Sequence, residues 1–336
     1  MTTKDPAGKG LLSPIQVGTL SLSNRIVMPP MATYMAGVDG EVNDRHIQHY
    51  LERARAHPGF IVVEVTCVSV EGRISSGVLG IDNDRQIPGL RRLAAAVKGE
   101  GTPVSIQIAH GGAKAIHPLA GDKVAPSNVC PPGAADTPRA LTSEEISTLV
   151  RTFGDAAVRA AEAGFDAVEL HGAHGYLLSQ FLSPYTNRRK DAYGGNLEAR
   201  LRFPLEVIAE VRRLLGPHFP LAYRLGASDR MPGGLTLEEG VMAAERLEAG
   251  GVDLLDISGG LTGDGQGLTE QGYFVYLAEA VKEKVSVPVI GVGNITDPEY
   301  ADRIIREGRV NLVAVGRAML TNPNWAADAA RQLQDS

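Results

Sequence analysis

The sequence predicts an α/β fold of the (β/α)8 TIM-barrel class, and three observations support this. Short apolar runs alternate with longer amphipathic segments along the whole chain. The apolar runs are nearly continuous, which is typical of parallel strands buried on both faces. The unit occurs eight times, and eight right-handed βα units close into a barrel. A doubly wound open sheet is the alternative, but it usually has fewer units and a glycine-rich fingerprint after its first strand.

The eight predicted strands are rich in Val, Ile and Leu. Because each run is short and is followed by a helical pattern, each is expected to form one strand of the barrel. They are Ile26–Met28, Phe60–Cys67, Val104–Ile108, Ala167–Leu170, Leu221–Leu225, Leu254–Ser258, Val289–Gly291 and Leu312–Val315.

The predicted helices have start and stop residues in the expected places. Thr142 and Thr236 precede pairs of glutamates, as N-caps do, and Gly164, Gly250 and Gly308 lie just past helix ends. The helices are expected at Asp44–Arg55, Gln86–Glu100, Ser143–Ala163, Leu197–Leu215, Thr236–Ala249, Phe274–Val285, Pro298–Glu307 and Asn324–Leu333.

The remaining segments define the ends and the loops. Residues 1–10 are polar and are expected to form a flexible tail, and residues 11–336 a single domain. Ile15–Leu22, with Gly18 at its turn, predicts a β-hairpin that closes the N-terminal end of the barrel. The stretches 110–141 and 172–196 are longer than ordinary connections, and long loops on a compact scaffold are usually functional.

Composition excludes several classes of protein. The 336 residues are 43% hydrophobic and 21% charged with a net charge of −6, as expected for a soluble globular protein. No basic block resembles a nucleic-acid footprint, and no apolar run is long enough to span a membrane. Cys67 and Cys130 are too few for a disulfide framework or a four-thiolate cluster. A cytoplasmic location is therefore expected.

Residues 171–176, with the sequence HGAHGY, directly follow the predicted strand at 167–170. This is the face where barrels hold their chemistry. A metal site and a purely structural role are alternatives for His171 and His174, but no third ligand stands out. We favour a pair that donates N–H groups to a carbonyl oxygen and stabilises developing negative charge. Tyr176 can then deliver a proton as general acid.

Two late loops predict a phosphate site. Gly293 lies in the loop after the seventh strand, and Gly316 and Arg317 follow the eighth. Barrels often bind a phosphate with these two loops, where glycines let backbone N–H groups approach the anion. The alternative is that the glycines only permit tight turns.

Gln107 and Arg224 are polar residues inside predicted buried strands. A buried guanidinium requires an anionic partner, because its desolvation is costly. Either a carboxylate lies beside Arg224, with Glu64 and Glu169 as candidates, or a ligand brings electron-rich oxygens. A flat aromatic cofactor with carbonyl groups would satisfy both Gln107 and Arg224.

Together, these motifs resemble the old yellow enzyme family of FMN-dependent ene-reductases and the barrel domain of 2,4-dienoyl-CoA reductases. The resemblance covers about residues 11–333. The matching segments are 24–31 (NRIVMPPM), 106–112 (IQIAHGG), 171–184 (HGAHGYLLSQFLSP), 187–189 (NRR) and 193–195 (YGG).

The resemblance implies a non-covalently bound FMN held by three groups of residues. Pro29, Pro30, Met31 and Ala32 would form a backbone shelf along the flavin ring, with Val65 at its edge. Gln107 and Arg224 would bind the pyrimidine part of the ring. Gly293, Gly316 and Arg317 would hold the phosphate. Ala32 departs from one bacterial branch of the family, which has a redox-tuning cysteine there.

The resemblance also implies the reaction. NADH or NADPH would reduce the flavin, and hydride would pass from flavin N5 to the β-carbon of an α,β-unsaturated carbonyl or nitro compound. His171 and His174 would bind the substrate oxygen, Tyr176 would protonate the α-carbon, and Tyr34 would close the pocket. No metal, nucleic acid or membrane is expected to take part, and a dimer or tetramer is compatible with the sequence.

Three other functions stay open at this point. The same barrel with FMN could dehydrogenate or N-demethylate an amine, which would favour an aromatic or acidic pocket. A phosphate-binding isomerase or lyase would need no flavin, and a flavin-binding protein need not be catalytic.

Overall fold

A computed structural model describes residues 9–37, 39–116, 122–134, 136–263, 265 and 267–335. Most of the predicted N-terminal tail, residues 1–8, lies outside the described residues. Within them, no helix is long and apolar enough to cross a membrane.

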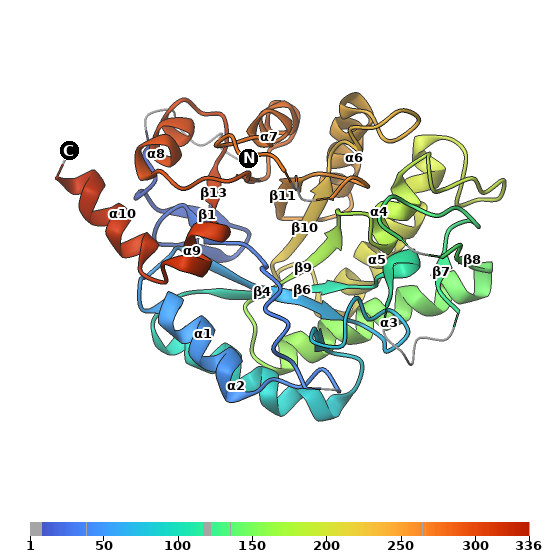
Figure 1. The fold of residues 1–336 in the computed structure, drawn as a ribbon, viewed down its shortest axis with the longest axis horizontal. Helices are drawn as coiled ribbons and strands as arrows, with labels where there is room; N and C mark the ends of the chain where they lie inside the picture. Colours follow the sequence, from blue (N-terminus) through green and yellow to red (C-terminus); the bar gives the residue numbers. More distant parts are fainter. Residues whose placement is uncertain are drawn as a thin grey trace.

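The centre of the fold is a closed ring of eight parallel strands (Figure 1). Around the ring they follow the order β3, β13, β12, β11, β10, β9, β6, β4, and β4 pairs with β3 to close it. This confirms the predicted (β/α)8 barrel, and each predicted strand differs from the observed one by two residues or fewer. The strands are β3 (Ile26–Met28), β4 (Phe60–Cys67), β6 (Val104–Ala109), β9 (Ala167–Gly172), β10 (Leu221–Gly226), β11 (Leu254–Ser258), β12 (Val289–Gly291) and β13 (Leu312–Ala314).

The ring is surrounded by helices that pack an apolar stripe against the strands (Figure 1). Thr142 and Thr236 are the N-caps of α3 and α6, and each hydroxyl accepts the backbone N–H three residues later, as their sequence context predicts. The helices are α1 (Asp44–Ala54), α2 (Ile87–Gly99), α3 (Ser143–Glu162), α4 (Leu177–Leu182), α5 (Leu197–Leu215), α6 (Leu237–Ala249), α7 (Val275–Lys282), α8 (Pro298–Arg306), α9 (Arg317–Thr321) and α10 (Trp325–Gln334), with 3-10 turns η1 (Asp84–Gln86) and η2 (Gly112–Lys114).

Some small elements were not predicted. α4 and α9 are each at most six residues long, and the strands β5 (Leu79–Gly80), β7 (Val124–Ala125) and β8 (Arg139–Ala140) have two residues each. β7 and β8 form a parallel pair within the long loop 110–141. Such short segments do not develop a period that a sequence can show.

The N-terminal end of the barrel is closed by a β-hairpin, as predicted. β1 (Ile15–Val17) pairs antiparallel with β2 (Leu20–Leu22) across a turn at Gly18, whose φ of 53° suits glycine. Val17 and Leu22 are buried against Phe60 and other apolar side chains of the barrel strands. The hairpin and these side chains form an apolar floor to the barrel.

Above this floor the barrel interior becomes polar. In the inter-strand register Gln107 lies beside Glu169, and Arg224 lies beside Asp256. Glu169 and Asp256 each lie two residues beyond an apolar floor residue on the same strand, so they share the inward-facing side. We call these four side chains the polar layer. Their exposed fractions are 5% or less.

The apolar floor predicts where the barrel is sensitive to truncation of a side chain. Phe60 is 1% exposed and packs in this floor, so Phe60→Ala should leave a cavity there. We expect it to lower the free energy of unfolding by about 3–5 kcal/mol, measured by urea denaturation. Met242→Ala, at a residue 46% exposed, is the control and should change it little. Equal, small losses in both variants would contradict the packing role of the floor.

Candidate functional site

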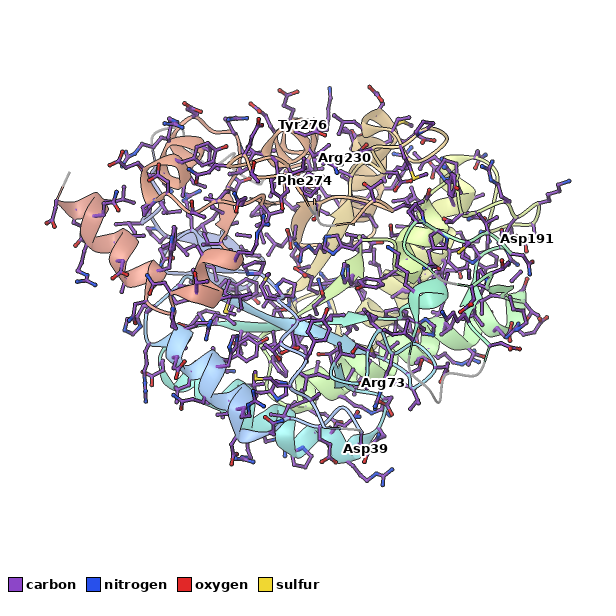
Figure 2. The ribbon with its side chains drawn as sticks, viewed as in Figure 1. Asp39, Arg73, Asp191, Arg230, Phe274 and Tyr276 are labelled. Carbon is purple, nitrogen blue, oxygen red and sulfur yellow. The ribbon has the colours of Figure 1, made fainter. Side chains whose placement is uncertain are left out.

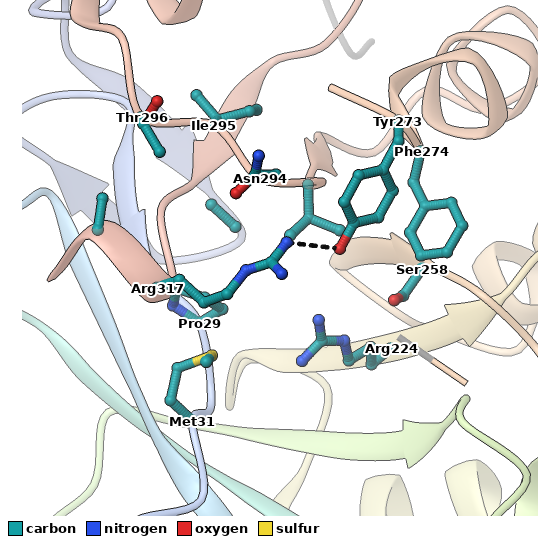
Figure 3. A pocket seen from close by; sticks show the side chains of 14 residues that line it. Pro29, Met31, Arg224, Ser258, Tyr273, Phe274, Asn294, Ile295, Thr296 and Arg317 are labelled. Atoms are coloured by element: carbon teal, nitrogen blue, oxygen red, sulfur yellow. Dashed lines mark hydrogen bonds between the residues drawn. The ribbon is translucent and has the colours of Figure 1, made fainter. Parts of the chain in front are cut away.

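A pocket lies at the carboxyl ends of the barrel strands. Pro29 and Met31, which follow β3, line one side, and Arg224 and Ser258, from β10 and β11, lie opposite (Figure 3). The loops after β12 and β13 complete the wall, with Arg317 at the start of α9. The structure therefore brings the predicted shelf, Arg224 and the predicted phosphate loops to one cavity.

The three predicted catalytic residues lie together at the end of β9. The rings of His171 and His174 are edge-to-face with centroids 5.0 Å apart. The ring of Tyr176 is also edge-to-face with that of His171, with centroids 5.0 Å apart. His171 is the last but one residue of β9, and Tyr176 precedes the first turn of α4. One turn of chain thus places two imidazoles and a phenol side by side.

Hydrogen bonds fix the orientation of both imidazoles. The backbone N–H of Ala173 donates to Nδ1 of His171 over 3.3 Å, so the proton of the neutral ring lies on Nε2. Nε2 of His174 lies 2.8 Å from Oγ of Ser258. Lys114 donates from Nζ to the carbonyl oxygen of His174 over 2.8 Å. This bond supports a backbone that has a φ of 57° at His174, a region that non-glycine residues rarely adopt.

Both histidines are held in the neutral form. Burial is the main cause that lowers the pKa of His171 and of His174 well below the ordinary 6.5. The positive charges of Arg224 and Lys114 lower both values further. The pair therefore offers N–H donors without a formal charge of its own, in surroundings made positive by its neighbours.

The shelf is anchored from below by a buried carboxylate. Glu64 in β4 accepts hydrogen bonds from the backbone N–H and from Oγ1 of Thr33, over 2.8 and 2.6 Å. Thr33 directly follows Ala32, which packs with Val65 in a small apolar cluster. Burial raises the pKa of Glu64 to about 6. The sequence suggested Glu64 as a partner for Arg224, and the structure shows it serving the shelf.

Arg224 has a carboxylate neighbour that the sequence analysis missed. Its Nε lies 3.2 Å from Oδ2 of Asp256 on the adjacent strand. Glu169, the other suggested partner, accepts a hydrogen bond from Nε2 of Gln107 over 2.8 Å. Asp256 could have been found by asking which charged residue shares the inward face of the neighbouring strand.

Arg317, in the second predicted phosphate loop, has a partner from the segment before α7 that the sequence did not indicate. Arg317 donates from Nη2 to the hydroxyl of Tyr273 over 3.1 Å, across the pocket (Figure 3). Gly293 has a φ of 135°, and a Cβ there would lie 2.8 Å from the backbone nitrogens of Tyr273 and Phe274. Close packing against this segment is thus one reason for the glycine. At Gly316 a Cβ would approach Sδ of Met31 to 2.8 Å.

The rim of the site carries another cation. The guanidinium of Arg230 lies 4.9 Å from the ring centre of Phe274, which lines the pocket (Figure 2). Tyr34, predicted to close the pocket, is 63% exposed with a φ of 55°. Its role over the site stays a prediction. Pro30 is buried between the shelf residues.

The residues around the pocket fit the cofactor that the sequence suggested. Arg224 is 5% exposed, and its guanidinium extends into the cavity (Figure 3). The buried guanidinium of Arg224 in the pocket and the buried amide of Gln107 in the polar layer suit the carbonyl oxygens and N–H of a flavin ring. Arg317 suits a phosphate. Arg224 and Arg317 both line this pocket.

Known proteins match over nearly the whole chain. Residues 10–336 match the NADH:flavin oxidoreductase / NADH oxidase family. An NADPH dehydrogenase of Geobacillus sp. (strain WCH70) is 42% identical over 324 residues, which cover 96% of this chain and 94% of that protein. An NADH oxidase of Thermoanaerobacter brockii is 44% identical over 333 residues, and the chain spans 51% of its length.

A solved structure of similar fold also matches nearly the whole chain. Morphinone reductase in complex with tetrahydroNAD superposes with a TM-score of 0.83 and 30% identity, and the match covers 96% of this chain and 91% of that one. The matching family, its relatives and the shared fold lead to one conclusion. The chain belongs to the NADH:flavin oxidoreductase / NADH oxidase family and is an FMN-dependent NAD(P)H oxidoreductase of the old yellow enzyme type.

Proposed function

We propose that the protein is an ene-reductase. It would use NADH or NADPH to reduce the activated C=C bond of α,β-unsaturated carbonyl or nitro compounds. The observation that carries this proposal is the pair of neutral imidazoles, His171 and His174, which neighbour Arg224 and Ser258 of the pocket. Two neutral imidazoles in contact with each other suit a substrate oxygen that gains negative charge during the reaction, because each ring has an N–H that can donate.

The cofactor would be held by ten residues, three of them in barrel strands and the others in the segments that directly follow strands. FMN, when bound, accepts hydride from the nicotinamide and passes it to the substrate. The shelf and its edge would support the ring, the buried amide and guanidinium would bind its pyrimidine part, and the late loops would bind the phosphate. These residues are Pro29, Pro30, Met31, Ala32, Val65, Gln107, Arg224, Gly293, Gly316 and Arg317.

The substrate would be polarised by the two histidines. Their N–H groups would bind its carbonyl or nitro oxygen and draw electron density from the double bond, which makes the β-carbon electrophilic. Tyr176 lies against His171 and would give its phenolic proton to the α-carbon. Tyr34 would cover the substrate from the first loop.

The charges around the histidines favour an oxygen ligand over an amine. Lys114 and Arg224 act on both imidazoles, and Arg230 lies on the rim. An ammonium substrate would meet these positive charges, because like charges repel most strongly where water is excluded. The amine-dehydrogenase alternative therefore has less support than the ene-reductase.

The purified protein provides the first test. It should be yellow with a flavin spectrum, NADH or NADPH should bleach it anaerobically, and cyclohexenone should restore the colour. A colourless protein that takes up no added FMN would overturn the assignment of the pocket. A flavoprotein that is reoxidised by amines but not by enones would overturn the proposed substrate class.

The histidines can be tested together. His171→Ala with His174→Ala should retain FMN, because neither imidazole belongs to the proposed cofactor set. Binding of phenols, measured by the change in the flavin spectrum, should be lost. Enone turnover should fall by at least about 10²-fold, since two donors to the developing oxyanion are removed. His218→Ala, at an exposed histidine, is the matched control. Unchanged enone turnover in the double variant would remove the oxyanion role.

Tyr176→Phe should separate the two half-reactions. Reduction by NAD(P)H transfers no proton from Tyr176, so its rate in stopped-flow measurements should be unchanged. Reoxidation by an enone should slow by about 10²-fold, because the general acid is absent. Equal slowing of both half-reactions would indicate a packing defect instead of a lost proton donor.

The protonation of the histidines can be measured directly. With ¹⁵N-labelled histidine, the ring signals of His171 and His174 should show no titration near the ordinary value of about 6.5, since burial and nearby cations lower both pKa values. In the urea-unfolded protein the same histidines should titrate near about 6.5. Signals are assigned with the single alanine variants. Folded-state titration of either ring near neutrality would show that the pair is charged at the pH of catalysis.

A further inference from the structure

Glu169, in the polar layer beneath the pocket, has no role in the reaction proposed above. We infer that Glu169 is a positioning residue, which holds the side-chain amide of Gln107 so that its carbonyl oxygen is presented to the flavin ring. This inference rests on the proposed placement of FMN against Gln107. It adds a residue that touches neither substrate nor cofactor.

The geometry of the contact sets the orientation of the amide. Gln107 in β6 and Glu169 in β9 are register neighbours, 1% and 0% exposed. Nε2 of Gln107 donates to Oε1 of Glu169 over 2.8 Å. With Nε2 committed to Glu169, Oε1 of Gln107 is directed elsewhere and is available to accept the N3–H of a flavin. Without Glu169 the amide could turn over at little cost.

The charges of the layer explain how a carboxyl group can lie here. Glu169 and Asp256 face a single guanidinium, that of Arg224, whose Nε is 3.2 Å from Asp256. Among the described residues, Oε2 of Glu169 has no hydrogen-bond partner. Burial, and then the charge of Asp256, raise the pKa of Glu169 to about 8. A neutral Glu169 leaves the layer without net charge, since Asp256 and Arg224 compensate each other.

The protonation state of Glu169 should also affect the reduction of the bound flavin. The groups that face Glu169 are Gln107 from β6, Arg224 from β10, Asp256 from β11 and, on its own strand, His171, which is neutral. Above about pH 8, Glu169 ionises and adds an uncompensated negative charge below the ring. Negative charge on the reduced ring is then disfavoured, so the midpoint potential should fall more steeply with pH.

Two substitutions separate orientation from charge. Glu169→Gln keeps a carbonyl oxygen that can accept from Gln107 but does not ionise, whereas Glu169→Leu removes the acceptor. FMN affinity is measured by titrating each apoprotein with FMN and following the flavin fluorescence. Glu169→Leu should weaken FMN binding by about 10-fold, the effect of one misdirected buried hydrogen bond. Glu169→Gln should stay within about 3-fold of the wild type.

The midpoint potential of the bound flavin is measured from about pH 6 to about pH 10 by reductive titration with a reference dye. The wild type should show the additional fall above about pH 8, where Glu169 ionises, and Glu169→Gln should lack it. Ser105→Ala is the control, because Ser105 is a fully buried residue of the same strand as Gln107. It should match the wild type in both measurements.

The outcomes distinguish this inference from the proposed function. A wild-type protein that binds no FMN would overturn both. If the wild type binds FMN and both Glu169 variants match it in affinity and at every pH, only the positioning role is overturned. If Glu169→Leu fails to fold, judged by circular dichroism of the apoprotein, the comparison of potentials between the wild type and Glu169→Gln decides.

Discussion

The interior of this barrel must hold charge where water cannot reach it, and the rest of the site depends on how that charge is compensated. Arg224 is 5% exposed and would be costly to bury alone. Asp256 compensates it from the next strand. The apolar floor excludes water from one side, which strengthens every electrostatic interaction in the layer above it. The guanidinium of Arg224, which lines the pocket, is therefore held in place by the fold.

Buried carboxyl groups support the site at two levels. Glu64 accepts two hydrogen bonds from Thr33, which follows the predicted shelf, and Glu169 accepts one from the amide of Gln107. Both lie in strands, which hold side chains more precisely than loops do. The segments after the strands carry Thr33, His174 and Arg317, whereas the strands carry Gln107, Glu169, Arg224 and Asp256. Such a division agrees with a fold that supports many reactions.

The sequence predicted the strands well because parallel strands buried on both faces leave long apolar runs, as in Phe60–Cys67. The cluster of His171, His174 and Tyr176 was also accessible, since it lies within six residues of chain. Asp256 was not, because its partner Arg224 is 32 residues away in sequence and only the strand register makes them neighbours. Tyr273 was missed because its partner Arg317 is 44 residues away in sequence. The sequence could not show that Gly293 packs closely against Tyr273 and Phe274. A loop glycine that binds a phosphate and one that contacts a neighbouring backbone look alike in a sequence.

The hairpin at the base has a practical consequence for anyone who modifies the chain. Its strands supply part of the lining that keeps the charged interior dry, although they lie on the face opposite the pocket. An affinity tag attached upstream of Leu11 leaves that lining in place. A deletion that extended through Leu22 would admit solvent to Arg224 and Asp256 from beneath, and flavin retention would suffer without any change at the mouth of the barrel.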